Sequence, residues 1–219
     1  MTTHPNARFW DGIAERYAKK PLPNPAATAR KLALTRDRLR PTDRLLDVGC
    51  GTGSIVLELA PHVAEAHGVD ISRNMIAIAH RKAAAVGTAN VVFHAQPAGT
   101  LDAFTDAQFD CVCAYNLLHL LDDSAALLQA MYRVTVPGGT LVTSTACLGG
   151  PLGPLFGGFL AVMRWLGKAP RVTVLRRDEL RAAVADAGFV DIETPDVGDS
   201  AQNVFLMARK PRLELRQFR

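Results

Sequence analysis

The sequence has few cysteines and no long uninterrupted hydrophobic segment. Of its four cysteines, Cys111 and Cys113 stand two apart in an expected strand, with no second pair of ligands nearby. This is not the spacing of a zinc site, so we expect no metal and interpret the cysteines as small buried residues in a reducing compartment. The most apolar stretch, from Pro151 to Met163, is interrupted by glycine and proline and is too short to span a bilayer.

Targeting signals and strong charge are also missing. The N-terminus lacks a basic segment followed by an apolar one, so we predict no signal peptide and a cytoplasmic protein. The formal net charge is +4, and residues 210–219 supply +3 of it, from four basic residues against Glu214. A short basic tail is typical of a solvated terminus, and we therefore expect no nucleic-acid partner.

Strand-like and helix-like segments alternate along the chain, which indicates a parallel α/β sheet. Asn24 and Pro25 mark one helix start, and Ser72 can cap a helix that Gly87 ends. The expected helices are 25–39, 54–60, 73–86, 124–134 and 177–187, and the expected strands are 44–48, 64–69, 91–94, 109–114, 140–146, 189–193 and 204–208.

The last two strands have no helix between them, so they can pair antiparallel. The pattern predicts a single Rossmann-like, doubly wound α/β sheet, mostly parallel with an antiparallel last strand, and helices on both faces. The length fits one domain over residues 1–219. Within it we expect a helical cover (1–40), a ligand-binding core (41–146), an apolar segment (147–176), a helix and strand pair (177–210) and a basic tail (211–219).

A glycine-rich loop follows the first expected strand, from Asp47 to Gly53, with the sequence D-V-G-C-G-T-G. Such loops let a nucleotide approach the backbone at the carboxyl end of the strand. The dinucleotide pattern G-x-G-x-x-G does not fit, because the third glycine comes one position early, and no Lys-Ser or Lys-Thr pair of a P-loop follows. Asp47 itself either supports the loop or faces a positively charged ligand.

Asp70 ends the second expected strand, about twenty residues beyond the glycine loop. An acid at this place can bind ribose hydroxyls. Alone, it would be interpreted as a turn residue. Together with the loop, it favours a ribose-containing ligand.

These motifs resemble those of the class I S-adenosylmethionine-dependent methyltransferases of the small-molecule type. The resemblance extends roughly from Phe9 to Lys210. Four segments carry it in the order of that family, namely Leu45–Gly53, Gly68–Ser72, Phe109–His119 and Arg133–Leu141.

The resemblance implies S-adenosylmethionine as cofactor. By position, Gly49 and Gly51 would lie against its methionine portion and ribose. Asp70 would bind both ribose hydroxyls, and Ile71 would pack on the adenine. Gln96 stands where the family usually has an acid that receives the adenine amino group, and its side-chain carbonyl can accept the same hydrogen bond.

Four further residues are expected at the cofactor on the same grounds. Asn116 would offer polar groups near the methionine end, and Asp47 and Cys50 belong to the loop. Tyr17 stands in a segment similar to one that folds over the cofactor in related enzymes. For Tyr17 and Trp10, ordinary helix packing is the competing interpretation.

Methyl transfer needs a base only if the acceptor is protonated. His119 is the candidate, because it follows the fourth strand on the side where the methyl group should emerge. Its apolar surroundings are more often those of a structural histidine.

The apolar segment 147–176 is predicted to select a small, apolar or aromatic acceptor. It contains Phe156, Phe159, Leu160, Met163 and Trp165, which would cover the acceptor or instead belong to a surface helix that closes the core or to a dimer contact. The sequence also leaves open a macromolecular acceptor and a non-catalytic binding protein of the same fold. An NAD-dependent oxidoreductase is opposed by the glycine spacing.

Overall fold

Seven strands form one sheet in the order β3-β2-β1-β4-β5-β7-β6. The computed structural model describes residues 5–21, 24–149 and 173–212. The strands are β1 (Arg44–Val48), β2 (Glu65–Asp70), β3 (Val91–Ala95), β4 (Phe109–Tyr115), β5 (Thr135–Ala146), β6 (Val190–Glu193) and β7 (Asn203–Arg209).

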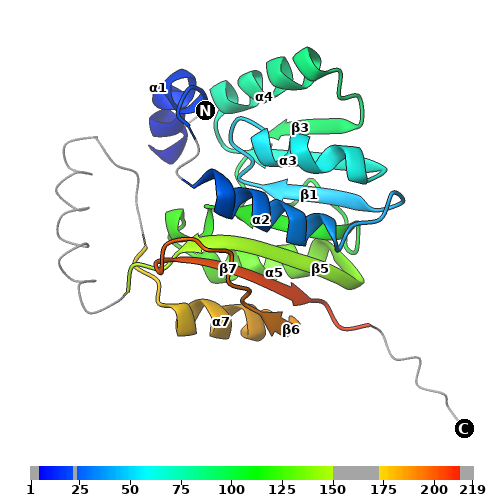
Figure 1. Cartoon of the computed structure of the whole chain (residues 1–219), viewed down its shortest axis with the longest axis vertical. Coiled ribbons are helices and arrows are strands. Elements are labelled where there is room, and N and C mark those ends of the chain that lie inside the picture. Colours follow the sequence, from blue (N-terminus) through cyan, green and yellow to red (C-terminus); the bar gives the residue numbers. More distant parts are fainter. Residues whose placement is uncertain (1–4, 22–23, 150–172, 213–219) are drawn as a thin grey trace, which may run out of the picture.

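Strands β1 to β5 run parallel, and β7 pairs antiparallel with both β5 and β6. Figure 1 shows β7 pointing against its neighbour β5. The predicted mostly parallel, doubly wound sheet is thereby confirmed.

Six helices and two short 3-10 turns surround the sheet in the described part of the chain. They are α1 (Pro5–Ala18), α2 (Pro25–Arg36), α3 (Ser54–Leu59), η1 (Ala60–His62), α4 (Arg73–Val86), η2 (Leu118–Leu120), α5 (Ser124–Val134) and α7 (Arg177–Asp186). None of them is long and apolar enough to cross a membrane. No group of three or more metal-binding side chains occurs among these residues either.

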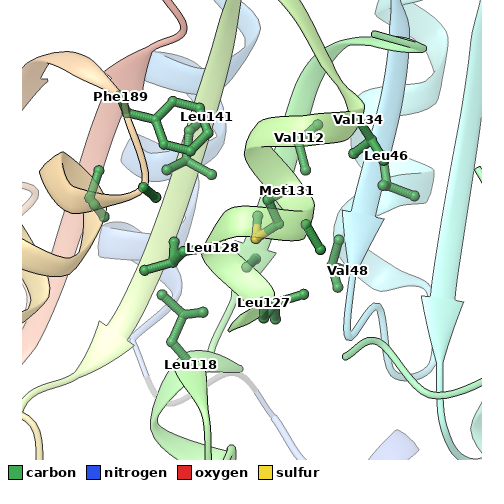
Figure 2. Packing of buried hydrophobic residues seen from close by; sticks show 14 of the residues in the cluster. Leu46, Val48, Val112, Leu118, Leu127, Leu128, Met131, Val134, Leu141 and Phe189 are labelled. Carbon is green, nitrogen blue, oxygen red and sulfur yellow. The ribbon is translucent and has the colours of Figure 1, made fainter. Parts of the chain in front are cut away.

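Alternating residues of the strands send side chains to opposite faces of the sheet. Leu46 and Val112 join the cluster under α5 and α7, whereas Leu45 and Cys111 join the cluster under α3 and α4. Figure 2 shows the first cluster, in which Leu127 and Met131 of α5 pack toward the central strands that carry Leu46, Val48 and Val112, and Leu128 lies on the side of Leu118. The sheet is therefore covered on both faces, as predicted.

Helix α2 ends at Arg36 rather than at the predicted Leu39. The reason lies in the last turn, where the hydrogen bonds change from i−4 to i−3 partners. Asp37 N–H still donates to Ala33, but Arg38 and Leu39 donate to the carbonyls three residues back. This tightening satisfies carbonyls at the helix end.

Strand β5 begins at Thr135 and not at the predicted Thr140. The Pro137-Gly138-Gly139 turn is part of the strand, because Gly138 N–H donates to Lys210 O (2.9 Å) and Lys210 N–H donates to Gly139 O (2.9 Å). The pairing register with β4 shifts at this point. The other predicted boundaries agree with the structure to within one residue, apart from the last residue of the second helix, Ala60, which belongs to η1.

The two neighbours of β1 define where a ligand can bind. The strand order reverses at β1, since the chain continues to β2 on one side and returns at β4 on the other. At such a switch point the loops leave in opposite directions and a crevice opens at the carboxyl edge. The glycine loop after β1 lies at this edge.

Candidate functional site

The glycine loop turns sharply because three of its residues adopt positive φ. Gly49, Gly51 and Gly53 have φ of 72°, 53° and 77°. The amide groups of Gly49 and Cys50 both donate to Val69 O, at 2.7 and 2.9 Å, which fixes the loop against β2. A Cβ on Gly53 would lie 2.9 Å from Ala79 Cβ, so this position needs glycine for packing.

Gly51 needs glycine for a different reason. A Cβ built on it would meet no atom of the described chain within 4 Å. The backbone here faces an open cavity instead of another element. This is the arrangement expected where a ligand approaches main-chain groups closely.

The carboxylate of Asp70 lies at the end of β2 and faces the glycine loop. Its Oδ2 accepts from Gly51 N–H (2.9 Å), and its Oδ1 accepts from Ser72 N–H (2.8 Å). Burial raises the pKa of Asp70, while these two amide donors act in the opposite direction. A carboxylate has about four lone-pair sites, so capacity remains for two further donors such as ribose hydroxyls.

A cavity of about 380 Å³ lies beside Asp70, and we call it the β2-side cavity. Its apolar lining includes Ile71, Met75, Leu117, Leu120 and Leu121. The residues after β3 that line it are Pro97, Ala98, Gly99 and Thr100. An acid at one end of an apolar slot suits a flat ring attached to a sugar.

A second cavity of about 370 Å³ lies on the other side of the glycine loop, toward α2, and we call it the α2-side cavity. Its walls include Thr28 and Lys31 of α2, and Asp199 and Asn203 before and at the start of β7. Both cavities are lined by a shared set of residues, Tyr17, Gly49, Gly51, Tyr115 and Asn116. The two spaces therefore meet at the loop.

Asp47 lines the α2-side cavity from the end of β1. The residue is 1% exposed, and its Oδ1 has no hydrogen-bond partner among the described residues. Burial and the nearby Asp70 raise the pKa of Asp47 to about 8. An unpaired buried carboxyl is costly, and a ligand cation entering the cavity would satisfy it.

Helix α1 lies over the junction of β2 and α4. Asp11 accepts from Ser72 Oγ (2.6 Å) and from Asn74 N–H (3.0 Å), which docks the helix there. Trp10 and Tyr17 stack edge to face with ring centroids 5.9 Å apart. Both line the β2-side cavity, and Trp10 also packs on the cluster of Met75 and its neighbours. Trp10 therefore both lines the cavity and takes part in ordinary helix packing.

Tyr17 is 43% exposed but stands at the point where the cavities meet. Partial burial and the Asp70 charge raise the pKa of its hydroxyl. The hydroxyl therefore stays protonated at neutral pH and can donate a hydrogen bond to a ligand.

Asn116 follows β4 with φ of 55°, in the left-handed region that asparagine tolerates better than most residues. Its N–H donates to Ser144 O (2.6 Å), which anchors the turn to β5. The residue is exposed and lines both cavities.

Gln96 is placed less directly than the other predicted residues. Its N–H donates to Asp70 O (2.9 Å), so its backbone lies at the correct edge of the sheet. The cavity lining begins one residue later, at Pro97, and Gln96 does not contribute to it. A contact between its side chain and an adenine stays a prediction.

His119 lies in η2 and lines the α2-side cavity. Burial lowers its pKa to about 4. At neutral pH the ring is therefore uncharged, and it is a weak proton acceptor. Its Nδ1 lies 3.4 Å from Ala146 N, a long contact that gives the ring little anchoring.

The predicted residues lie in two groups around the loop. The β2-side cavity is lined by Asp70 and Ile71, the α2-side cavity by Asp47, Cys50 and His119, and both by the remaining residues except Gln96. The predicted apolar cover, with Phe156, Phe159, Leu160, Met163 and Trp165, lies outside the described residues.

The sequence did not point to Lys31, Asp199, Ser144 or Asn203. These four form one hydrogen-bonded group at the wall of the α2-side cavity. A lysine in the middle of an expected helix is usually solvated, and the only signal in the sequence was the apolar residues about one helical turn away, Ala27 and Leu34.

Comparisons with known proteins agree with this geometry. Residues 45–139 match a family described as a methyltransferase domain. The demethylmenaquinone methyltransferase of Geobacillus kaustophilus (strain HTA426) is 35% identical over 184 residues, which cover 75% of this chain and 78% of the relative. An O-methyltransferase of Aspergillus sclerotiorum is 30% identical over 173 residues, which cover 78% of this chain and 64% of the relative.

A solved structure extends the similarity to the fold of nearly the whole chain. It is phosphoethanolamine N-methyltransferase 2 of Haemonchus contortus in complex with S-adenosyl-L-methionine. The TM-score is 0.76 at 19% identity, and the match covers 95% of this chain and 60% of that one.

Proposed function

The chain belongs to the class I S-adenosylmethionine-dependent methyltransferases, and we propose that it methylates a small aromatic acceptor held in the α2-side cavity. The observation that carries the proposal is the meeting of two cavities at the glycine loop, along Gly49, Gly51 and Asn116. One cavity suits the nucleoside part of the cofactor. The other leaves room for an acceptor beside its methionine end.

The residues around the β2-side cavity fit the cofactor. Asp70 has lone pairs left for the ribose hydroxyls, and Ile71 and Leu117 offer apolar surfaces for the adenine. The open space above Gly51 admits a close ligand. We propose that Gln96, which follows β3 beside the end of β2, accepts a hydrogen bond from the adenine amino group.

The methionine end would lie at the loop. Its positively charged amino group would satisfy the unpaired Oδ1 of Asp47, with the backbone of Cys50 and the side chains of Tyr17 and Asn116 around it. Because a cation favours the ionised carboxylate, binding would bring the pKa of Asp47 down from about 8.

The bound cofactor supplies a methyl group that the sulfonium has already activated. The protein then has to hold the acceptor in line with the breaking bond, at roughly 3–3.5 Å, and to exclude water. One relative supports a ring compound as acceptor, since it is named for demethylmenaquinone, a quinone. We propose in addition that segment 147–176 contributes apolar contacts to such a ring.

His119 is at most a secondary participant in this reaction. With a pKa of about 4, it would take a proton from a phenolic hydroxyl against a difference of about 6 pKa units, or roughly 8 kcal/mol. We therefore propose that it lines the acceptor space and is not the principal base.

The experiment uses the purified full-length chain with methyl-labelled S-adenosylmethionine and a cell extract separated by molecular mass. We expect label in the low-mass fraction, in compounds with an aromatic ring. Label only in protein or nucleic acid would favour a macromolecular acceptor, and label only in highly polar, non-aromatic compounds would refute the aromatic acceptor.

A further inference from the structure

Lys31 is a buried lysine in the middle of α2. It is 4% exposed, and it lines the α2-side cavity. Its Nζ donates to Asp199 Oδ2 (2.6 Å) and to Ser144 Oγ (2.9 Å). Burying an ammonium group is costly, so its place here calls for a physical reason.

Asp199 is well satisfied by the protein. Besides the hydrogen bond from Lys31, it accepts from Ser200 N–H (2.8 Å) and from Asn203 Nδ2 (2.8 Å). Burial works against ionisation of this carboxyl, but the hydrogen bond from Lys31 and the other donors hold its pKa below the usual range. The carboxylate has three partners.

Lys31 is less well satisfied than Asp199. An ammonium group has three N–H donors, and residues 5–21, 24–149 and 173–212 supply two acceptors for them. Leaving a charged donor unmatched next to a cavity is unfavourable. An oxygen atom of a ligand in that cavity would complete the set.

The ion pair is not needed to attach α2 to the loop before β7. Two other hydrogen bonds already do so, since Arg30 donates to Val197 O (3.1 Å) and Asn24 Nδ2 donates to Gly198 O (3.2 Å). Uncharged side chains of similar size at both positions, such as methionine at 31 and asparagine at 199, would avoid the cost of desolvating the two charges. A function in binding explains the lysine better than a structural one.

We propose that Lys31 Nζ binds an ionised ring hydroxyl of the acceptor, so that the α2-side cavity selects phenols and hydroquinones. This inference rests on the proposed function. The hydroxyl proton passes to solvent as the ring binds. The electron pair of the phenolate then forms the new bond to the methyl carbon, either from oxygen or from the adjacent ring carbon, while the carbon–sulfur bond breaks and its pair stays on sulfur. In the carbon case, that ring carbon afterwards loses its proton to solvent.

The other groups in the cavity are consistent with this assignment. The remaining charged or acidic side chains that line it are Lys20, Asp47, Lys82 and Asp199. Lys82 is engaged by Thr52 and Ser54 at 2.8 and 2.9 Å. Since His119 is a weak base, an ammonium group that stabilises the phenolate provides the activation that a general base would otherwise supply.

The test measures binding of two matched probes to the full-length protein saturated with S-adenosylhomocysteine. The probes are 1-naphthol and 1-methylnaphthalene. They share the same ring system, but the first carries a hydroxyl group where the second carries a methyl group. We expect the protein to prefer 1-naphthol by about 10- to 100-fold, as a hydrogen bond to a charged group allows. Bound 1-naphthol should also ionise at lower pH than free 1-naphthol, which its absorption spectrum reports.

Variants separate a binding role from a structural one. Lys31→Met should abolish both the preference and the lowered ionisation pH, and Lys31→Arg should restore most of each. Asp199→Asn should lower the ionisation pH further, because the ammonium then has no neutralising partner. A purely structural ion pair predicts instead that Lys31→Met and Asp199→Asn weaken both probes equally. Lys19→Met, at an exposed lysine after α1, is the matched control.

An unchanged 1-naphthol preference in Lys31→Met would overturn the inference, and so would the lack of any preference in the unmodified protein. Tighter binding of 1-naphthoate than of 1-naphthol would replace the phenolate by a carboxylate and also overturn it. If Lys31→Met does not fold, the double variant with Asp199→Asn removes both buried charges together. Failure to bind S-adenosylmethionine in calorimetry would count against the proposed function and is read separately.

Discussion

Replacing Asp47 by asparagine removes the acidic proton of this buried side chain and leaves its size nearly unchanged. The folded protein keeps this proton up to about pH 8, whereas the usual value for the group is 3.8. The folded state therefore binds more protons than the unfolded chain across that window. Stability from this group is fully present below about pH 4 and is lost as the pH rises toward 8.

The magnitude follows from the size of the shift. Each pKa unit corresponds to about 1.4 kcal/mol, so a shift of about four units removes at most about 6 kcal/mol by pH 8. Between about pH 5.5 and pH 8 the loss is about 3 kcal/mol. Asparagine does not ionise, so the variant should escape this loss.

Urea denaturation at the two pH values provides the measurement. We expect the gap in free energy of unfolding between Asp47→Asn and the unmodified protein to widen by about 3 kcal/mol from about pH 5.5 to pH 8. Other carboxyls with a raised pKa, such as Asp70, are present in both proteins, so their effects on stability largely cancel in the difference. Asp186→Asn, on the exposed end of α7, controls for the loss of one surface carboxylate.

The cofactor gives the second half of the test. With saturating S-adenosylmethionine, a cation beside Asp47 should keep the carboxylate ionised at both pH values, and the widening should disappear. A gap that stays constant with pH in the free protein would refute the argument from burial. A gap that widens equally with and without the cofactor would refute the proposed position of the amino group.

Four further variants test the loop and its neighbours. Asp70→Asn should weaken S-adenosylmethionine binding about 10- to 100-fold in calorimetry, and an unchanged affinity would remove Asp70 from the site. Gly51→Ala should cost only about 1–2 kcal/mol of stability through its positive φ but lower cofactor affinity at least about tenfold, because its Cβ enters the cavity. Gly53→Ala should instead lose about 1–3 kcal/mol more in urea denaturation, because its Cβ would press on Ala79 and Phe93; equal stabilities would contradict this. His119→Gln should leave the shape of the kcat/KM profile unchanged above pH 6, since the ring is already neutral there; loss of an inflection near pH 7 would show that it titrates.

Local chemistry explains which elements could be predicted. The helix over 73–86 was predicted with both ends correct, because Ser72 accepts from Met75 N–H and Gly87 adopts the left-handed conformation that ends a helix. The helix over 124–134 is similar, with Asp123 accepting from Ala126 N–H. In each case the signal lies within a few residues of the boundary it sets.

The features that the sequence did not reveal depend on residues far apart in the chain. The early start of β5 depends on pairing of Gly138 and Gly139 with Lys210. The partners of Lys31 are 113 and 168 residues away. The loop glycines and Asp70 were found because their chemistry is carried by a motif, whereas the wall of the α2-side cavity is assembled only by folding.

The antiparallel direction of β7 decides how this protein can be handled in the laboratory. Because β7 runs against β5, its first residue, Asn203, lies at the cavity edge beside Ala146, and its far end leads Lys210 to the opposite edge beside Gly138. A purification tag or fusion partner on the C-terminal side is thus attached through the edge of the sheet that lies opposite both cavities. One joined ahead of α1 begins close to Asn6 and Trp10, at the rim of the β2-side cavity, and is the poorer choice for measuring the binding of cofactor or acceptor.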